Sequence, residues 1–230
     1  MRSRIDFEDV TVAPLSGMLS TLEDGSIGFD CNQVLSYSQA KAFYDDGFRF
    51  VMRYVSRNTV QGTNDLTRNE CEDIHRAGLA IGVVQHVSPE GWDASAMKGT
   101  DYGTNAARQV INLGFPAGMS VWCDLEGINP NDPDSMAFAS AWYHAVDSYN
   151  LNPGIYLGWH DLITGKQAYN LPFKSYWSAY NLDGSQFPNP RGVQIRQASE
   201  RVRHGVRYDP DTVSADKMGD RPWFYLPHNA

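Results

Sequence analysis

The segment 119–126, Met-Ser-Val-Trp-Cys-Asp-Leu-Glu, is the part of this sequence that most clearly indicates a fold. It begins as an almost uninterrupted apolar run, which is typical of a strand buried on both faces of a parallel sheet. It then ends in two acidic residues. Because side chains two positions apart on a strand point the same way, Asp124 and Glu126 are expected to project together from the end of this strand.

Short apolar runs alternate with stretches of helical periodicity along the rest of the chain, which is the pattern of βα units. Strands are predicted at residues 27–30, 49–55, 79–87, 119–126, 153–157, 175–180, 193–197 and 206–213. Full crossover helices are predicted in the first half and reduced ones later. These elements predict the α/β class and an irregular TIM-type (β/α) barrel, with residues 1–25 as an N-terminal arm and residues 26–230 as a single barrel domain.

Capping residues mark several of the predicted helices. Ser38 is expected to cap the first helix with its hydroxyl. Thr67 and Glu70 form the pattern of a capping box at the start of the second helix. Gly78 and Gly114 follow helical stretches and are expected to end them, since glycine readily adopts the left-handed conformation of a helix stop.

The composition argues against some partners. The formal net charge is −8 and the sequence pI is near 5.1, whereas a nucleic-acid partner requires a basic face. No segment is long and apolar enough to span a bilayer, and the N-terminus lacks the apolar core of a signal peptide. We therefore expect a soluble chain synthesised in the cytoplasm, which lysis or signal-independent secretion must deliver if it acts outside the cell.

The sequence favours neither metal nor nucleophile chemistry. The 3 cysteines, Cys31, Cys71 and Cys123, fit neither a disulfide framework nor a zinc site. Buried free thiols are expected, with a Cys31–Cys123 disulfide as the alternative. We find no metal-type histidine spacing, no catalytic serine or cysteine arrangement and no glycine-rich phosphate loop. No metal and no organic cofactor are expected.

Acidic residues lie at or near three of the predicted strands: Asp30 after the first, Asp124 with Glu126 after the fourth, and Asp209 or Asp211 near the last. In a (β/α) barrel the carboxyl ends of the strands converge on one open face. Carboxylates placed together raise one another's proton affinity, so one can stay protonated while another stays ionised. Glycoside hydrolysis needs this division between a proton donor and a charge-stabilising carboxylate.

Each acid also has a structural interpretation. An Asp that follows a strand often caps a helix, and for Asp30 alone the two interpretations are balanced. For the segment 209–211, Asp-Pro-Asp, a turn is the favoured interpretation because Asp-Pro initiates turns. For Asp124 and Glu126 the structural interpretation is the weaker one, because Glu is a poor turn former.

Polar and aromatic residues at or near the predicted strand ends could bind a sugar, although each alone is more often a core or rim residue. They are Tyr54, Gln85, His86, Tyr156, Trp159, Tyr180, Asn181 and Gln197. The loops at 88–92 and 129–133 are expected to form walls of the substrate site by their position alone.

Several short motifs, taken in order, resemble those of the DUF1906 glycoside-hydrolase-like family, relatives of the family 25 lysozymes. The motifs are residues 28–30, 49–54, 77–82, 102–107 and 121–127, and the resemblance covers roughly residues 26–213. It implies an irregular (β/α) barrel with Glu126 as the general acid and Asp124 as its electrostatic assistant. The family's first-strand Asp matches Asp30, and its late Asp matches Asp209 or Asp211.

The resemblance implies a lysozyme-like hydrolase that cuts peptidoglycan glycan strands at the muramic acid β-1,4 bond. We expect Glu126, Asp124, Asp30 and Asp209 to be catalytic. The expected substrate-binding residues are Tyr54, His86, Tyr156, Trp159, Tyr180, Gln197 and Asp211. One alternative is a barrel that binds cell-wall glycan without cutting it, and another is a glycosidase acting on a different polysaccharide. The expected site of action is the cell wall, reached after lysis or signal-independent secretion.

Overall fold

The computed structural model describes residues 12–86, 88, 91–127, 133–158 and 163–228, and its centre is a closed barrel of strands. Around the barrel the strand order is β4-β3-β2-β10-β8-β7-β6-β5, and pairing of β5 with β4 closes it. The strands are β2 (Ile27–Cys31), β3 (Phe50–Val55), β4 (Ala80–Gln85), β5 (Ser120–Leu125), β6 (Asn152–Leu157), β7 (Ser175–Ser178), β8 (Ile195–Gln197) and β10 (Val206–Val213). The predicted irregular (β/α) barrel is confirmed.

The last barrel strand, β10, runs against its neighbours. The other seven pair in parallel, whereas β10 is antiparallel to both β2 and β8. The favoured turn at 209–211 is therefore wrong, because these residues form the middle of β10. Pro210 costs the strand one backbone donor, yet its carbonyl still accepts a hydrogen bond from the Ala198 N–H at 2.7 Å.

Three short strands extend the barrel. β1 (Met18–Ser20) lies within the segment expected to be an arm, and it pairs with β11 (Phe224–Leu226), which in turn pairs with β4 through Tyr225 opposite Ile81. β9 (Arg201–Arg203) forms a hairpin with β10. The Phe224 ring packs against Phe50 in the barrel interior.

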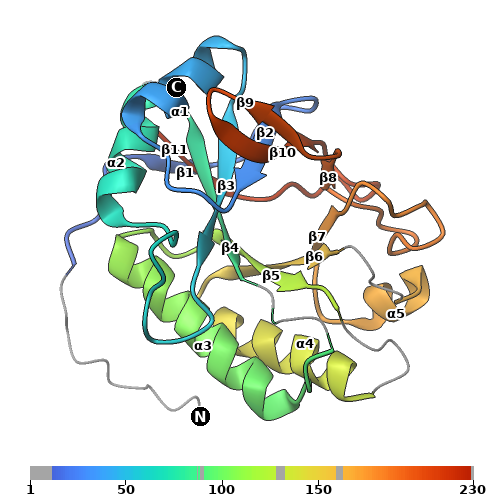
Figure 1. Ribbon diagram of the computed structural model, residues 1–230. Helices are drawn as coiled ribbons and strands as arrows, with labels where there is room; N and C mark the ends of the chain where they lie inside the picture. Colours follow the sequence, from blue (N-terminus) through green and yellow to red (C-terminus); the bar gives the residue numbers. More distant parts are fainter. Residues whose placement is uncertain (1–11, 87, 89–90, 128–132, 159–162, 229–230) are drawn as a thin grey trace.

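Helices cover most of the outside of the barrel. They are α1 (Tyr37–Asp45), α2 (Arg68–Ala77), α3 (Ala96–Leu113), α4 (Pro133–Asp147) and α5 (Gly165–Asn170). Figure 1 shows α1 and α2 along one side of the strands and α3 and α4 side by side along another. The connection 179–194 between β7 and β8 contains no helix. No helix in the described part of the chain is long and apolar enough to cross a membrane.

The helix caps agree in part with the prediction. Thr67 caps α2 as expected, but the Glu70 carboxylate turns into the protein and binds Arg53. Gly78 and Gly114 end their helices in the left-handed conformation, as predicted. Ser38 as the first cap is wrong, because Ser36 forms a full capping box with Gln39.

Glycines let large side chains fill the barrel interior. A Cβ at Gly28 would lie 2.4 Å from the Phe50 ring, and one at Gly154 would lie 2.5 Å from the Trp122 ring. Trp122 packs edge-on against Trp177, with ring centroids 6.1 Å apart. Alternating very small and very large residues on neighbouring strands closes the barrel below the site without leaving a pore.

Replacing Gly154 by Ala should therefore destabilise the protein. The new methyl group overlaps the fully buried Trp122, so the free energy of unfolding should fall by about 1–3 kcal/mol. Urea denaturation of wild type and variant measures the change. Gly184→Ala is the control, since a Cβ there meets nothing within 4 Å. Equal stability of the two variants would contradict this account of the interior.

Candidate active site

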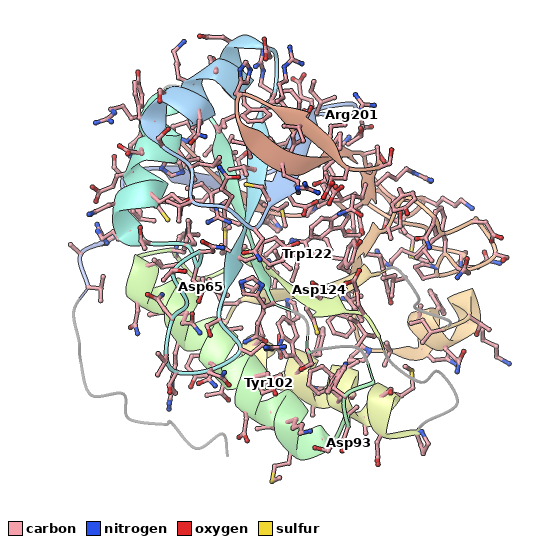
Figure 2. The ribbon with its side chains drawn as sticks, in the orientation of Figure 1. Asp65, Asp93, Tyr102, Trp122, Asp124 and Arg201 are labelled. Carbon is pink, nitrogen blue, oxygen red and sulfur yellow. The ribbon has the colours of Figure 1, made fainter. Side chains whose placement is uncertain are left out.

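An acidic pocket of about 450 Å³ opens at the carboxyl ends of the parallel strands. The residues that line it are Tyr54, Asp124, Glu126, Tyr156, Tyr180, Gln197, Ser199, Glu200 and Asp209. Asp124 comes from β5, the strand that also carries Trp122 (Figure 2). Glu126 follows the same strand, and Asp209 reaches the pocket from the middle of β10. The structure thus brings together seven of the residues that the sequence predicts for the site.

Asp30 lies just behind this lining and is almost fully buried. Its Oδ1 accepts a hydrogen bond from the Tyr54 hydroxyl at 3.0 Å, and its Oδ2 accepts one from Gln197 Nε2 at 2.8 Å. Gln197 Oε1 in turn accepts from the Tyr156 hydroxyl at 2.8 Å. A continuous chain of hydrogen bonds therefore links side chains from β2, β3, β6 and β8 at the floor of the pocket.

Burial and mutual repulsion raise the pKa of two acids at the pocket, Asp30 and Asp209. Burial, with the nearby charges of Asp209 and Glu126, raises the pKa of Asp30 to about 7. Burial, with the charges of Glu200 and Glu126, raises the pKa of Asp209 to about 6. Near neutral pH the site therefore holds both protonated and ionised carboxyl groups, as acid–base chemistry requires.

Asp211 does not line the pocket. It lies deeper in the barrel, where it is 1% exposed and accepts a hydrogen bond from Trp177 Nε1 at 2.9 Å. Its Oδ2 has no hydrogen-bond partner among the described residues. Burial, together with the charge of Asp30, raises the pKa of Asp211 well above its usual range, so this carboxyl group is neutral.

Two residues fix the position of Glu126. Gly158 leaves the space that the Glu126 side chain fills, because a Cβ at Gly158 would lie 1.9 Å from Glu126 Cγ. Trp92 donates from its indole Nε1 to the Glu126 carbonyl oxygen at 3.2 Å, and its own ring packs edge-on against Phe138. Trp92, from the loop at 88–92 expected to be a substrate wall, thus anchors the backbone of the candidate acid.

His86 lies beside the pocket. Its ring stacks on Tyr54 with centroids 4.7 Å apart, and its Nε2 lies 2.9 Å from Asp65 Oδ1. It lines a neighbouring polar hollow of about 560 Å³ with Asp65 and Asn32. The two hollows share the stacked pair of Tyr54 and His86 as their boundary.

Two further predicted residues, Gln85 and Asn181, are not part of this lining. Gln85 is buried under the helices, where it donates to the carbonyls of Ser56 and Tyr102 and accepts from Trp142. Alternate residues of a strand face opposite sides, so Gln85 points out of the barrel toward the helices whereas Val84 points into the barrel interior. Asn181 does not line the pocket either. Trp159 and residues 129–132 lie outside the described residues.

Some residues of the site were not predicted. Ser199 and Glu200 line the pocket from the connection between β8 and β9, where no pattern in the sequence distinguishes them from an ordinary loop. The ion pair of Arg53 could have been predicted from the sequence, because a charged residue within an apolar strand needs a buried partner of opposite charge. That partner is Glu70, with Arg53 Nε donating to Glu70 Oε1 at 2.7 Å.

The three cysteines are buried free thiols, so the Cys31–Cys123 disulfide is not formed. Burial raises the pKa of the Cys31 thiol to about 12, which makes it a poor nucleophile. Within the described ranges, no group of three or more His, Cys, Asp or Glu side chains is placed to hold a metal ion.

The sequence of residues 41–216 matches the family described as "Rv2525c-like, glycoside hydrolase-like domain". The chain belongs to this family. The resemblance inferred from the short motifs is thereby confirmed. No curated protein matches the sequence.

Solved structures share the fold at low sequence identity. The Tat-secreted protein Rv2525c of Mycobacterium tuberculosis superposes with a TM-score of 0.63 and 16% identity, covering 84% of this chain and 98% of that one. An uncharacterised protein of B. stearothermophilus gives 0.61 and 19%, covering 83% and 96%. The modular autolysin LytC of Streptococcus pneumoniae gives 0.61 and 10%, covering 83% of this chain but 47% of LytC.

Replacing Asp30 by Asn should change how stability depends on pH. The pKa of Asp30 is about 7 in the folded protein against an ordinary 3.8. The stability it contributes is therefore present in acid and is lost as pH rises through 7. Asn stays neutral at every pH and can keep hydrogen bonds to Tyr54 and Gln197 if the Gln197 amide inverts. The variant should therefore melt at a higher temperature than wild type at about pH 8 and lose this advantage near pH 4.

Melting curves over this pH range measure the effect. Asp101→Asn, an exposed change on α3, is the control and should leave the pH dependence unaltered. If the melting temperatures of wild type and the Asp30 variant changed with pH in the same way, burial would not be raising the pKa of Asp30.

Proposed function

We propose that this protein is a glycoside hydrolase that cuts the glycan strands of peptidoglycan, with Glu126 as the general acid and Asp124 assisting. The observation that carries the proposal is the convergence of Asp124, Glu126 and Asp209 on one open pocket at the mouth of the barrel, with Asp30 directly behind its lining. Such crowding is costly unless the carboxyl groups differ in protonation, and glycosidic bond cleavage uses that difference.

Glu126 is placed where a substrate can reach it. It lines the pocket, its side chain packs over Gly158, and its backbone is held by Trp92. Asp30 is instead held by two donors on the floor of the pocket. In the proposed reaction Glu126 protonates the leaving glycosidic oxygen, while Asp124 assists by stabilising the positive charge that develops on the sugar.

Aromatic residues of the pocket suit a sugar substrate. Tyr54, Tyr156 and Tyr180 combine a flat apolar ring with a hydroxyl that can form hydrogen bonds. Burial raises the pKa of Tyr54 and Tyr156 far above neutral pH, so both keep their hydroxyl protons, which they donate to Asp30 and Gln197. Their hydroxyl oxygens can still accept hydrogen bonds from a sugar. We assign these rings to sugar contact and His86, next to Tyr54, to a neighbouring position along the glycan.

Peptidoglycan as the substrate is supported by the proteins that share the fold. One LytC structure holds a synthetic peptidoglycan ligand, SleM of Clostridium perfringens is a spore cortex lytic enzyme, and ply40 is an endolysin of a Listeria phage. At 10–12% identity these proteins support the choice of substrate class without establishing it for this chain. The cell wall is accordingly our proposed site of action.

Release of reducing ends from purified peptidoglycan tests the proposal. Glu126→Gln keeps the size of the side chain and removes its acidity, so the rate should fall by at least about 100-fold. Glu72→Gln makes the same chemical change on the exposed face of α2 and should keep the wild-type rate. Mass spectrometry of the released fragments identifies the bond that is cut.

Two outcomes would overturn the assignment. Equal rates for wild type and Glu126→Gln would remove Glu126 from the reaction. Retention on sacculi without any new reducing ends would instead identify a barrel that binds wall glycan and does not cut it. Activity on another polysaccharide alone would keep the chemistry and change the substrate.

Gly158→Ala gives a second test of the position of Glu126. The added methyl group overlaps Glu126 Cγ, so the carboxyl group must move. Displacement of a catalytic group by about 1 Å can lower a rate on the order of 100-fold, and we expect the loss in kcat rather than in KM. Gly184→Ala serves as the control for a general effect of added methyl groups. Full activity of Gly158→Ala would contradict the proposed placement.

A further inference from the structure

A hollow on the outer flank of the barrel has a charge opposite to that of the chain. It has a volume of about 810 Å³ and lies between α5 and the helix-free connection 179–194. Three cations, Lys166, Arg196 and Lys217, line it with the rings of Tyr169 and Phe187. These five residues are called the basic groove below. The chain as a whole carries a net charge of −8, so the groove is a local reversal of charge.

The fold itself leaves the basic groove open. Helices cover the connections between the earlier parallel strands, but none follows β7 (Figure 1). On β8, Gln197 faces the acidic pocket, whereas Arg196 is exposed and faces the groove. Gly165 lets α5 approach the connection closely, because a Cβ there would lie 2.1 Å from the Phe187 carbonyl oxygen. The groove is thus a built feature on the opposite side of β8 from the acidic pocket.

The cations of the basic groove have no acidic partners within the described residues. Acids on the neighbouring segments have other partners: Asp216 and Asp220 each lie 2.6 Å from Arg191, and the Asp183 carboxylate accepts hydrogen bonds from the backbone N–H and the hydroxyl of Ser185. On the β9–β10 hairpin, by contrast, Arg203 pairs with Asp46 and Arg207 with Glu200. Three clustered cations without partners repel one another, and a bound anion would relieve that repulsion.

The size and chemistry of the basic groove favour a chain over a single ion. Its volume falls within the range of about 300–1,000 Å³ that holds organic ligands of many atoms. The Arg196 guanidinium stacks over Phe187, 4.8 Å from the ring centroid, which keeps its planar fork oriented for phosphate or carboxylate. Tyr169, which is 41% exposed, offers a ring face to a sugar or polyol.

We propose that the basic groove binds an anionic glycopolymer, a chain of sugar or polyol units that carries phosphate or carboxylate groups. Its position outside the barrel keeps such a polymer away from the acidic pocket, which would repel it. The groove would therefore hold the protein on a polyanionic surface while the pocket remains free for an uncharged stretch of glycan. Binding at the groove requires no catalysis, so it stands independently of the proposed hydrolase activity.

Titration with defined polymers tests the proposal, using the full chain with Glu126→Gln so that cleavage cannot interfere. The probes are a poly(glycerol phosphate), polygalacturonate and uncharged dextran. Calorimetry at low and high salt measures the binding of each probe. Lys166→Glu with Lys217→Glu should weaken binding of the preferred anionic polymer at least roughly tenfold. Lys41→Glu with Lys98→Glu changes the net charge equally at other surfaces and should weaken it less than about twofold.

The preferred polymer distinguishes phosphate from carboxylate as the recognised group. Melting curves should show both double variants folded, because the replaced lysines are at the surface. Equal weakening by both double variants would show a response to net charge alone and overturn the proposal. Failure to bind either anionic polymer, or equal binding of dextran, would also overturn it. Arg196→Gln provides a single-charge variant with no reversal, and it should weaken binding while Phe187 stays in place.

Discussion

The buried ion pair between Arg53 and Glu70 is the interaction on which the site depends. Arg53 is fully buried in β3 and binds Glu70 through two nitrogens, while it also donates to the carbonyls of Cys31 and Asn64. Glu70 additionally accepts from the Leu35 N–H at 2.8 Å. Because a buried pair gains little stability over apolar packing, its value here is positional. It fixes the residues next to Asp30 and Tyr54 and so fixes the floor of the pocket.

Electrostatic repulsion between carboxyl groups is a second constraint on the site. Four acidic side chains line the barrel mouth and Asp30 lies directly behind them, above an apolar interior, so ionising all five is unfavourable. The chain meets the constraint by burying Asp30, which raises the pKa of that carboxyl group to about 7, while Glu126 stays at the opening. Glycines supply the remaining freedom, because Gly154 admits Trp122 and Gly158 admits Glu126. Packing and protonation are therefore set by the same few positions.

The sequence allowed most of the first half of the barrel to be predicted, because buried parallel strands such as β5 are apolar throughout and their helices carry clear caps and glycine stops. Asp124, Glu126 and Asp30 followed from that pattern. The errors arise where contacts between distant parts of the chain determine the conformation. The direction of a strand leaves no local signal in the sequence, so residues 209–211 were predicted to form a turn. Residues 79–87 are apolar almost throughout, without alternating polar residues, so the sequence does not show that Gln85 points outward. Glu200 enters the site only because β9 and β10 fold back as a hairpin.

The antiparallel course of β10 explains why the irregular half of the barrel contributes to the site. A parallel strand delivers its final residues to the mouth, as β5 delivers Asp124. β10 instead passes the mouth in the opposite direction and presents alternate residues at two depths, with Asp209 opposite Asp30 and Asp211 opposite Gly28. The upper carboxyl group joins the pocket, and the lower one stays buried on Trp177. Reversing one strand thus adds an acid to the mouth and a hairpin to its rim, which a regular eighth βα unit would not supply.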